Sequence, residues 1–205
     1  MLKTSEIFKL VKFYMNTSHV SAIILAAGNG KRFGGKKQFI EFMGRPVWRW
    51  SYDTAANLIK DIVVVGINVK GGKSRQESVC IGLEKTKGKF VVIFDAARPL
   101  VTEKQVSQII KTVEKYPSVS FGILPSDTIY ENGEYKRSGL MALQVPQAFN
   151  RKMLLEAHRQ TKIKDATDDT KIFLEVHGIK PKIIKGARNL HKLTVKEDLN
   201  ILRML

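Results

Sequence analysis

The chain has very little cysteine: among its 205 residues, only Cys80 carries a thiol. A single cysteine excludes an intramolecular disulfide and is typical of a reducing compartment, so we expect a cytoplasmic protein. The sequence also lacks a C-x-x-C pair and a recognisable RNA-reading motif, and its four histidines do not have the spacing of metal ligands. A zinc site or a histidine-based metal centre is therefore not expected.

Long apolar runs and nucleophilic triads are missing as well. No Ser-His-Asp or Cys-His set is recognisable, which disfavours covalent catalysis. Residues 1–18 have apolar side chains at helical spacing, but lysines interrupt them, which excludes a signal peptide and a membrane span. We expect an amphipathic N-terminal extension over residues 1–18, with Met15 as an alternative start, and one α/β domain over residues 19–205. No membrane partner is expected.

Acidic residues are few relative to basic ones, with 19 Asp and Glu against 35 Lys and Arg and a formal net charge of +16. Such an excess indicates anionic partners: phosphorylated small molecules, nucleic acid or a membrane surface. A solvated, lysine-rich surface is the simpler explanation for much of it.

The stretch from Ser21 to Phe39 combines the features of a phosphate-binding loop. The apolar residues 22–25 predict a buried strand. The small residues 26–30 follow, and they let backbone amides approach a ligand closely. Four cations then lie within seven residues: Lys31, Arg32, Lys36 and Lys37. Free amides and fixed positive charge at a strand end suit a polyphosphate, whereas an ordinary surface turn is the alternative.

Two common phosphate-binding loops do not fit this stretch. A dinucleotide-binding G-x-G-x-x-G motif fails because Phe33 occupies the last glycine position. A P-loop fails because Lys37 stands where its magnesium-binding hydroxyl is required. The loop is therefore of another kind.

A second glycine-rich segment precedes a predicted helix over residues 74–84. Ser74 and Glu77 have the spacing of a capping box at its start. Arg75 and Ser78 lie one turn apart, and either a ligand-facing surface or a plain polar helix face explains them. The connection before Gly71 is too short for a crossover helix, unless residues 67–70 form a short strand.

Asp95 directly follows a predicted strand over residues 90–94. Ligands of open α/β sheets bind beyond the carboxyl ends of the strands. A carboxylate beside a basic phosphate loop suits Mg²⁺, which binds one or two carboxylates together with substrate phosphates. The alternatives are a turn-forming or capping role for Asp95 and a salt bridge to it for Arg98.

Predicted strands and helices alternate along most of the chain, which indicates a mainly parallel three-layer sheet. Helices are predicted over residues 46–59 and over residues 151–158. Another helix is predicted to begin at Thr102, whose side chain forms a capping box with Gln105. The remaining elements are a strand over 119–124, a helix opening at 166–169 and ending at Gly178, a strand over 182–184, and a terminal helix capped by Thr194 with Glu197.

The segment 126–144 breaks this alternation. Two short runs flank Asn132-Gly133, and Asn-Gly is the strongest short-range signal for a β-hairpin. Because an isolated hairpin is marginal in water, this arm should pack against a second subunit or against its own domain.

Eight motifs resemble one enzyme family in their order along residues 20–205: AAGNGKRF, KKQF, GGKSRQESV, DAARP, SDT, QVPQ, ATDD and HKLTVKEDL. They resemble the 2-C-methyl-D-erythritol 4-phosphate cytidylyltransferases of isoprenoid biosynthesis and their relatives, the ribitol-5-phosphate cytidylyltransferases. The resemblance implies a Rossmann-like three-layer α/β/α nucleotidyltransferase sheet, mainly parallel, with a protruding β-hairpin arm through which a homodimer forms. The chain departs from the family pattern in its short segment before Gly71, in Lys36 where Pro is usual, and in Val145 where Thr is usual.

The resemblance also implies roles for individual residues. The catalytic cations would be Arg32, Lys37 and Lys192. The nucleotide would be bound by Ala26, Ala27, Gly28, Gly30, Gly71, Gly72, Ser78, Asp95, Ala96 and Ala97. Asp95 would also bind the metal, Mg²⁺. The acceptor would be bound by Arg98, Thr128, Arg137 and Thr167, with Thr128 and Arg137 reaching across from the partner subunit.

The implied reaction transfers CMP from CTP to a sugar-alcohol phosphate and releases pyrophosphate. The favoured acceptor is 2-C-methyl-D-erythritol 4-phosphate, and the alternative is ribitol 5-phosphate. A nucleotidyltransferase for another base or for a sugar 1-phosphate is a further alternative. The hypothesis from another class is a basic nucleic-acid-binding α/β protein, although no nucleic-acid partner is implied by the resemblance.

Overall fold

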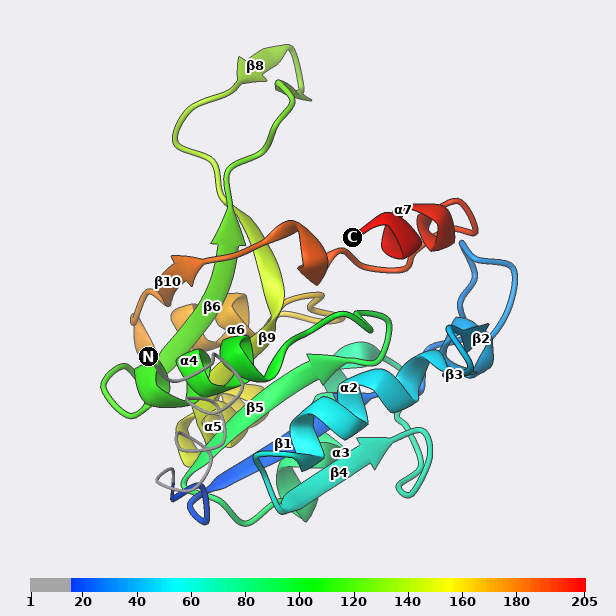
Figure 1. Ribbon diagram of the computed structural model, residues 1–205. Coiled ribbons are helices and arrows are strands. Elements are labelled where there is room, and N and C mark those ends of the chain that lie inside the picture. The colour runs from blue at the N-terminus through cyan, green and yellow to red at the C-terminus, as the bar shows by residue number, and fades with distance from the viewer. Residues whose placement is uncertain (1–15) are drawn as a thin grey trace, which may run out of the picture.

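The computed structural model describes residues 16–205, so most of the predicted N-terminal extension lies outside the described residues. A six-stranded sheet forms the centre of the domain, in the order β10-β6-β9-β5-β1-β4 (Figure 1). All neighbouring strands run parallel except β9, which is antiparallel to both β5 and β6. The strands are β1 (Val20–Leu25), β4 (Asp61–Val65), β5 (Phe90–Asp95), β6 (Ser118–Ile123), β9 (Ala142–Asn150) and β10 (Lys182–Lys185).

Helices cover both faces of the sheet, which confirms the predicted three-layer α/β/α arrangement. The core on one face takes side chains from α3 (Arg75–Lys85), α5 (Arg151–Gln160) and α6 (Asp169–His177). The core on the other face takes them from α2 (Val47–Ala56) and α4 (Glu103–Val113). All six residues of β5 are buried between these layers, as expected for a central strand with both faces covered.

Local signals at the helix ends explain where α3, α4 and α6 begin or end. The predicted capping box of α4 is present, with Thr102 and Gln105 bonding each other's backbone amides. At the start of α3, the Ser74 hydroxyl accepts from the Glu77 amide, and α6 ends at Gly178 in the left-handed conformation.

The short connection after β4 does not contain the suggested strand over residues 67–70. A tight turn leaves a single bridge between Val65 and Val69, and the Asn68 amide oxygen accepts from the Val64 amide at 2.9 Å. The chain then enters α3, which itself makes the crossover from β4 to β5. No additional helix is needed, because α3 spans the distance.

Three further boundaries differ from the sequence prediction. Strand β9 was not predicted. The helix predicted over residues 46–59 is the shorter α2, and Pro46 is its N-cap rather than its first helical residue. The terminal helix α7 (Asp198–Met204) has Glu197 as its N-cap, but no side chain caps it, so the predicted pairing of Thr194 with Glu197 is wrong. The reason is that the Asp198 carboxylate accepts from the Thr194 amide instead.

The predicted β-hairpin arm is present and stands away from the body of the domain (Figure 1). Strands β7 (Ile129–Glu131) and β8 (Glu134–Lys136) are joined by Asn132 and Gly133, both with positive φ as a tight hairpin turn requires. The rings of Tyr130 and Tyr135 lie 5.1 Å apart and are exposed.

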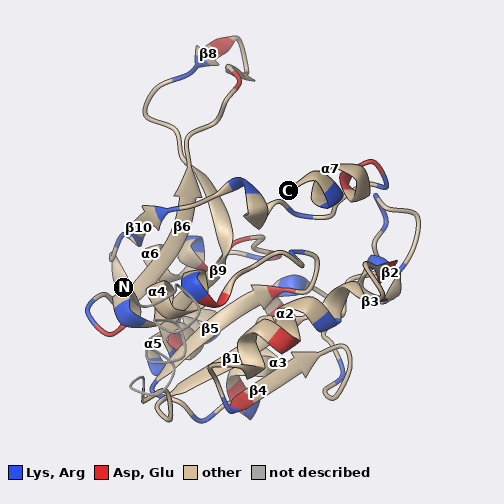
Figure 2. Ribbon diagram, viewed as in Figure 1, with Lys and Arg blue, Asp and Glu red and all other residues tan. Residues whose placement is uncertain are grey.

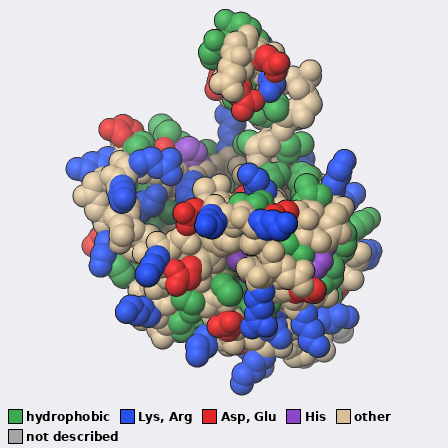
Figure 3. All heavy atoms as spheres, turned by 180° about the vertical axis from the view of Figure 1, so that it is seen from behind, with side chains coloured by type: hydrophobic (Ala, Val, Ile, Leu, Met, Phe, Trp, Pro, Cys, Tyr) green, Lys and Arg blue, Asp and Glu red, His purple; other side chains and the backbone are tan. Residues whose placement is uncertain are grey.

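The remaining short elements are η1 (Lys37–Phe39), η2 (Arg188–Leu190) and a two-stranded antiparallel pair, β2 (Glu41–Phe42) and β3 (Arg45–Pro46). None of the helices between residues 16 and 205 has the length and apolar character that crossing a membrane requires. Lys and Arg side chains are spread over the domain and its rear face rather than gathered in one stripe (Figures 2 and 3).

Candidate active site

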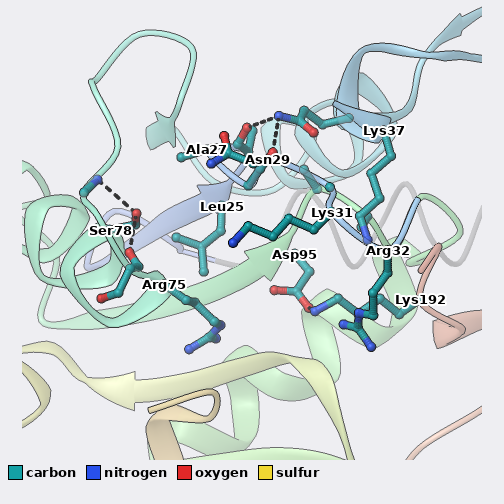
Figure 4. Close-up of a pocket in the computed structure, with 18 of the residues that line it drawn as sticks. Leu25, Ala27, Asn29, Lys31, Arg32, Lys37, Arg75, Ser78, Asp95 and Lys192 are labelled. Carbon is teal, nitrogen blue, oxygen red and sulfur yellow. Dashed lines mark hydrogen bonds and ion pairs between the residues drawn. The ribbon is translucent and has the colours of Figure 1, made fainter. Parts of the chain in front are cut away.

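A pocket of about 350 Å³ lies at the carboxyl ends of β1 and β5. This is the position at which open α/β sheets bind ligands. Four segments that are distant in sequence meet here: the loop after β1, the start of α3, the loop after β5 and the segment before α7 (Figure 4). In this view Ser78 and Arg75 lie on one side and Arg32, Lys37 and Lys192 on the other, with Asp95 between them.

The loop after β1 presents its backbone amides to this pocket. The Gln38 side chain donates to the carbonyls of Ala26 at 2.8 Å and Gly28 at 3.0 Å, which fixes the shape of the loop. Within residues 16–205, the amides of residues 27–32 donate to no other residue. Because backbone N–H groups need acceptors, this run of free donors is suited to phosphate oxygens.

Gly30 closes the loop in a way that other residues could not. It has a φ of +63°, and its carbonyl accepts from the amides of Phe33, Gly34 and Gly35. A Cβ atom at this position would lie 1.8 Å from the Gly35 carbonyl oxygen. The turn therefore requires glycine for both its backbone conformation and its packing.

Positive charge is concentrated along the same loop. Lys31 and Arg32 are exposed at the pocket, whereas Lys37 is half-buried and donates to the Leu193 carbonyl at 2.5 Å. Burial lowers the pKa of Lys37 below its ordinary value, and the neighbouring charges of Lys192 and Arg32 lower it further. This crowding of cations is unfavourable in the free protein and is relieved by a bound polyanion.

Asp95 is the buried acidic group at the centre of the pocket. Its Oδ2 atom lies 2.8 Å from Lys192 Nζ and 3.5 Å from Arg98 Nε. Burial alone would raise the pKa of Asp95, but the charges of Lys192, Arg75 and Arg98 outweigh it and hold that pKa well below the usual range. Asp95 is therefore ionised at neutral pH.

The start of α3 forms another side of the pocket, where Gly72, Lys73, Ser74, Arg75 and Ser78 line it. The Ser78 hydroxyl donates to the Ser74 carbonyl at 2.9 Å and accepts from the Gly72 amide at 3.1 Å. A Cβ atom on Gly71 would lie 2.2 Å from the Ala27 side chain, so glycine allows the two loops to approach closely.

Arg75 also lines the pocket, although the sequence left a plain polar face as an equal explanation for it. Its Nη2 atom lies 2.7 Å from Asp169 Oδ2, and the other oxygen of Asp169 lies 3.2 Å from His158 Nε2. The signal that could have identified it was the one-turn spacing from Ser78, which places both side chains on the same face of α3.

The structure brings most of the predicted site residues together. The pocket-lining members are Ala26, Ala27, Gly28, Gly30, Arg32, Lys37, Gly72, Ser78, Asp95, Ala96, Ala97 and Lys192. Asn29 and Lys31 of the predicted phosphate-binding loop line it too, and so does Gln38, for which no role was predicted.

Five predicted residues do not line the pocket within one chain. Gly71 lies behind the loop after β1, and Arg98 supports Asp95. Thr167 is exposed just before α6. Thr128 and Arg137 are exposed on the arm and do not line this pocket.

Comparison with known proteins identifies relatives of the whole domain. The family model IspD, 2-C-methyl-D-erythritol 4-phosphate cytidylyltransferase, matches residues 20–205. The enzyme of that name from Clostridium beijerinckii is 34% identical over an alignment of 215 positions, and the alignment covers 88% of this chain and 95% of the relative. The enzyme from Aquifex aeolicus is 32% identical over 207 residues, covering 90% and 96%.

Solved structures share the fold. The bifunctional IspDF from Campylobacter jejuni has a TM-score of 0.81 and 31% identity, and the match covers 90% of this chain and 54% of that longer chain. The 2-C-methyl-D-erythritol 4-phosphate cytidylyltransferase from Thermus thermophilus has a TM-score of 0.79, with 24% identity and coverage of 91% and 98%. The family match over residues 20–205 and the curated relatives above 30% identity show the family: the chain belongs to the IspD family of 2-C-methyl-D-erythritol 4-phosphate cytidylyltransferases.

Proposed function

We propose that this protein transfers CMP from CTP to 2-C-methyl-D-erythritol 4-phosphate and releases pyrophosphate, in the synthesis of isoprenoid precursors. Family membership over residues 20–205 supports the reaction. The observation that carries the proposal is the convergence of free loop amides with Arg32, Lys37 and Lys192 around one pocket.

The chemistry needs no protein base, because the attacking oxygen belongs to a phosphate that is already an anion. That oxygen attacks the α-phosphorus of CTP in line, and the bond to the β-phosphate breaks. The barrier comes from bringing anions together and from charge that develops on the α-phosphate and the leaving group. Preorganised cations reduce this barrier by positioning and electrostatics.

The amides of residues 27–30 are suited to hold the triphosphate, with Arg32 and Lys37 against the α-phosphate and the leaving group. Lys192 would contact the phosphates from the same side as Arg32 and Lys37 (Figure 4). The part of the pocket lined by Ala27, Gly72 and Ser78 would receive the cytosine and its ribose, because polar groups there can pair with base edges.

Asp95 would hold Mg²⁺ in this proposal. Residues 16–205 contain no group of three His, Cys, Asp or Glu side chains that could bind a metal by themselves. One ionised carboxylate beside a triphosphate is nevertheless the donor set that Mg²⁺ usually takes, with phosphate oxygens and water as the other ligands. When bound, the ion would neutralise charge on the α-phosphate and the leaving group.

The acceptor site would be completed by a second copy of the chain. Exposed apolar side chains on the arm, Ile129, Tyr130 and Tyr135, support burial against a partner. In such a homodimer, Thr128 and Arg137 of the arm would meet the acceptor phosphate together with Thr167 of the other chain. The single thiol, Cys80, supports a cytoplasmic location.

The test is pyrophosphate release with each nucleoside triphosphate against a panel of tetritol and pentitol phosphates, with Mg²⁺ present. We expect turnover with CTP and 2-C-methyl-D-erythritol 4-phosphate that exceeds every other pair. Preference for ribitol 5-phosphate would reassign the acceptor. Turnover with another nucleotide, or none with any pair, would overturn the proposal.

A further inference from the structure

The segment just before α7 contacts three separate parts of the pocket. Lys192 Nζ lies 2.8 Å from Asp95 Oδ2. The next residue, Leu193, accepts from Lys37 Nζ at 2.5 Å through its carbonyl and donates to the Ala97 carbonyl at 2.8 Å through its amide. Lys192 and Leu193 therefore connect the loop after β1, through Lys37, to the end of β5 and the loop after it, through Asp95 and Ala97.

Asp198, the first residue of α7, holds this segment in its shape. Its Oδ2 atom accepts from the Thr194 amide at 2.6 Å and from the Val195 amide at 2.9 Å. Its Oδ1 atom lies 2.8 Å from His191 Nε2. One carboxylate thus closes the chain from residue 191 to residue 195 around Lys192 and Leu193.

Packing fixes α7 itself in place. Leu202 of α7 and Leu193 are buried in a cluster with Phe33, Phe42 and Ala97. Phe33 belongs to the phosphate loop and Ala97 to the loop after β5. Asp198 therefore projects from a helix that is anchored to the same loops whose side chains form the pocket.

The electrostatics agree with a carboxylate that works in its ionised form. Burial would raise the pKa of Asp198, but hydrogen bonds from His191 and from the amides of Val195 and Thr194 outweigh it and lower that pKa. Charge-assisted bonds of this kind are among the stronger hydrogen bonds in proteins. Asp198 does not line the pocket, so any effect on the reaction passes through Lys192 and Lys37.

We propose that Asp198 is a positioning residue for cytidylyl transfer: it shapes residues 191–195 so that Lys192 stays beside Asp95 and the Leu193 carbonyl holds Lys37 in place. The inference rests on the proposed function. Loss of the carboxylate releases both contacts together, so Lys192 and Lys37 lose their fixed positions while the phosphate loop keeps its amides. Turnover should therefore suffer more than CTP binding.

The test compares Asp198→Ala and Asp198→Asn with Glu197→Ala in the full-length enzyme. Glu197 is the adjacent exposed carboxylate, and its side chain caps nothing, so it controls for charge in this region. We expect Asp198→Ala to lower kcat by about ten- to hundredfold, with the KM for CTP within about threefold. Asn retains an oxygen for the two amides but loses the charge, so its loss of kcat should be smaller than that of Asp198→Ala, and Glu197→Ala should behave as wild type.

A double-mutant cycle separates positioning from general destabilisation. If Asp198 acts through Lys192, Lys192→Ala should cost at least about tenfold less in the Asp198→Ala background than in wild type. Additive losses, a kcat of Asp198→Ala near wild type, or a change confined to the KM for CTP would each overturn the inference.

Two further measurements keep the outcome clear. Thermal unfolding shows whether Asp198→Ala is folded. If it is not, Asp198→Glu replaces it in the cycle, because Glu keeps the charge and moves the carboxylate by one methylene. The same assays on wild type identify a failure of the proposed function, since that failure removes activity with CTP and 2-C-methyl-D-erythritol 4-phosphate before any substitution is made.

Discussion

Arg75 and Asp169 form an ion pair of 2.7 Å that joins the first turn of α3 to the first turn of α6. Asp169 is fully buried, and its second oxygen meets His158 of α5 at 3.2 Å. The pair links the helix that carries Ser78 to the loop that carries Thr167. Both sides of the proposed substrate site thereby share one fixed contact.

The first prediction concerns stability. Asp169→Ala leaves the Arg75 charge buried without its partner, so it should lower the free energy of unfolding by about 3–5 kcal/mol. Glu84→Ala removes the exposed partner of Arg159 at 3.4 Å and is the matched control, with an expected change below about 1 kcal/mol. Urea denaturation of both variants measures the difference. Equal, small changes would show that the buried pair does not hold α3 to α6.

The second prediction concerns the cations of the phosphate loop. Arg32→Ala and Lys37→Ala should each lower turnover by about 10²–10³, because each removes a positive charge that stabilises the negative charge developing on the phosphates. Lys36→Ala is the neighbouring control: Lys36 is exposed and does not line the pocket, so its loss should change turnover little. Steady-state kinetics with circular dichroism as a folding check decide it. Near-normal rates in both test variants would contradict the assignment.

The sequence predicted the glycine-rich, basic side of the pocket because its signals are local. A strand, a run of small residues and a cluster of cations lie within residues 21–39, and Asp95 directly follows its own strand. Each signal depends on neighbours in the chain. The meeting of these segments in one pocket then follows from the parallel sheet, whose strands end at a common edge.

Strand β9 could not be predicted in the same way. Its segment contains Gln144, Pro146 and Gln147, which disfavour a strand when read locally. In the structure, the Gln147 side chain donates to Ser120 and Asp168, and Gln144 pairs with the Ala187 backbone. Distant partners satisfy these polar groups, and no local pattern reveals such partners.

The capping error at α7 has a similar cause. Thr194 and Glu197 have capping-box spacing, but the chain turns so that the Asp198 carboxylate takes the amides of residues 194 and 195. The spacing correctly indicated a polar start of the helix, but it indicated Glu197 as the capping carboxylate instead of Asp198. The choice depends on the packing of α7 against the loops of the pocket.

A third prediction concerns the phosphate-loop turn. Gly30→Ala places a Cβ atom 1.8 Å from the Gly35 carbonyl oxygen at a φ of +63°, so the loop must change shape. A left-handed residue alone costs about 1–2 kcal/mol, so the KM for CTP should rise about tenfold or more. Gly35→Ala is the control, because its Cβ meets nothing within 4 Å. An equal effect of both substitutions on the KM would contradict the proposed shape requirement.

A fourth prediction concerns the arm. If Arg137 serves the partner's pocket, Arg137→Ala and Lys37→Ala should each be inactive alone but complement each other when unfolded together and refolded. Half of the dimers are then mixed, and each has one intact site, so roughly a quarter of wild-type activity per protomer should return. Activity assays before and after mixing measure it. No recovery in a preparation that sedimentation shows to be dimeric would place both residues in the same site.

A matched pair of substitutions tests the dimer contact itself. Changing Tyr130 and Tyr135 to Ser removes the exposed apolar surface of the arm, and sedimentation should then detect monomers. Tyr116→Ser alters an exposed aromatic outside the arm and should leave the dimer intact. Dimers in the double variant would contradict assembly through the arm.

The last prediction concerns alkaline pH. Burial and the charges of Lys192 and Arg32 lower the pKa of Lys37, so its charged form is lost at a lower pH than that of an ordinary lysine. The positive charge is present below the shifted pKa, and activity should fall as pH rises through it. The profile of kcat/KM should therefore have an alkaline limb below about 10.4, the usual lysine value. Lys37→Arg keeps its charge throughout that range, so any activity it retains should not show this limb; a limb that persists in this variant belongs to another group.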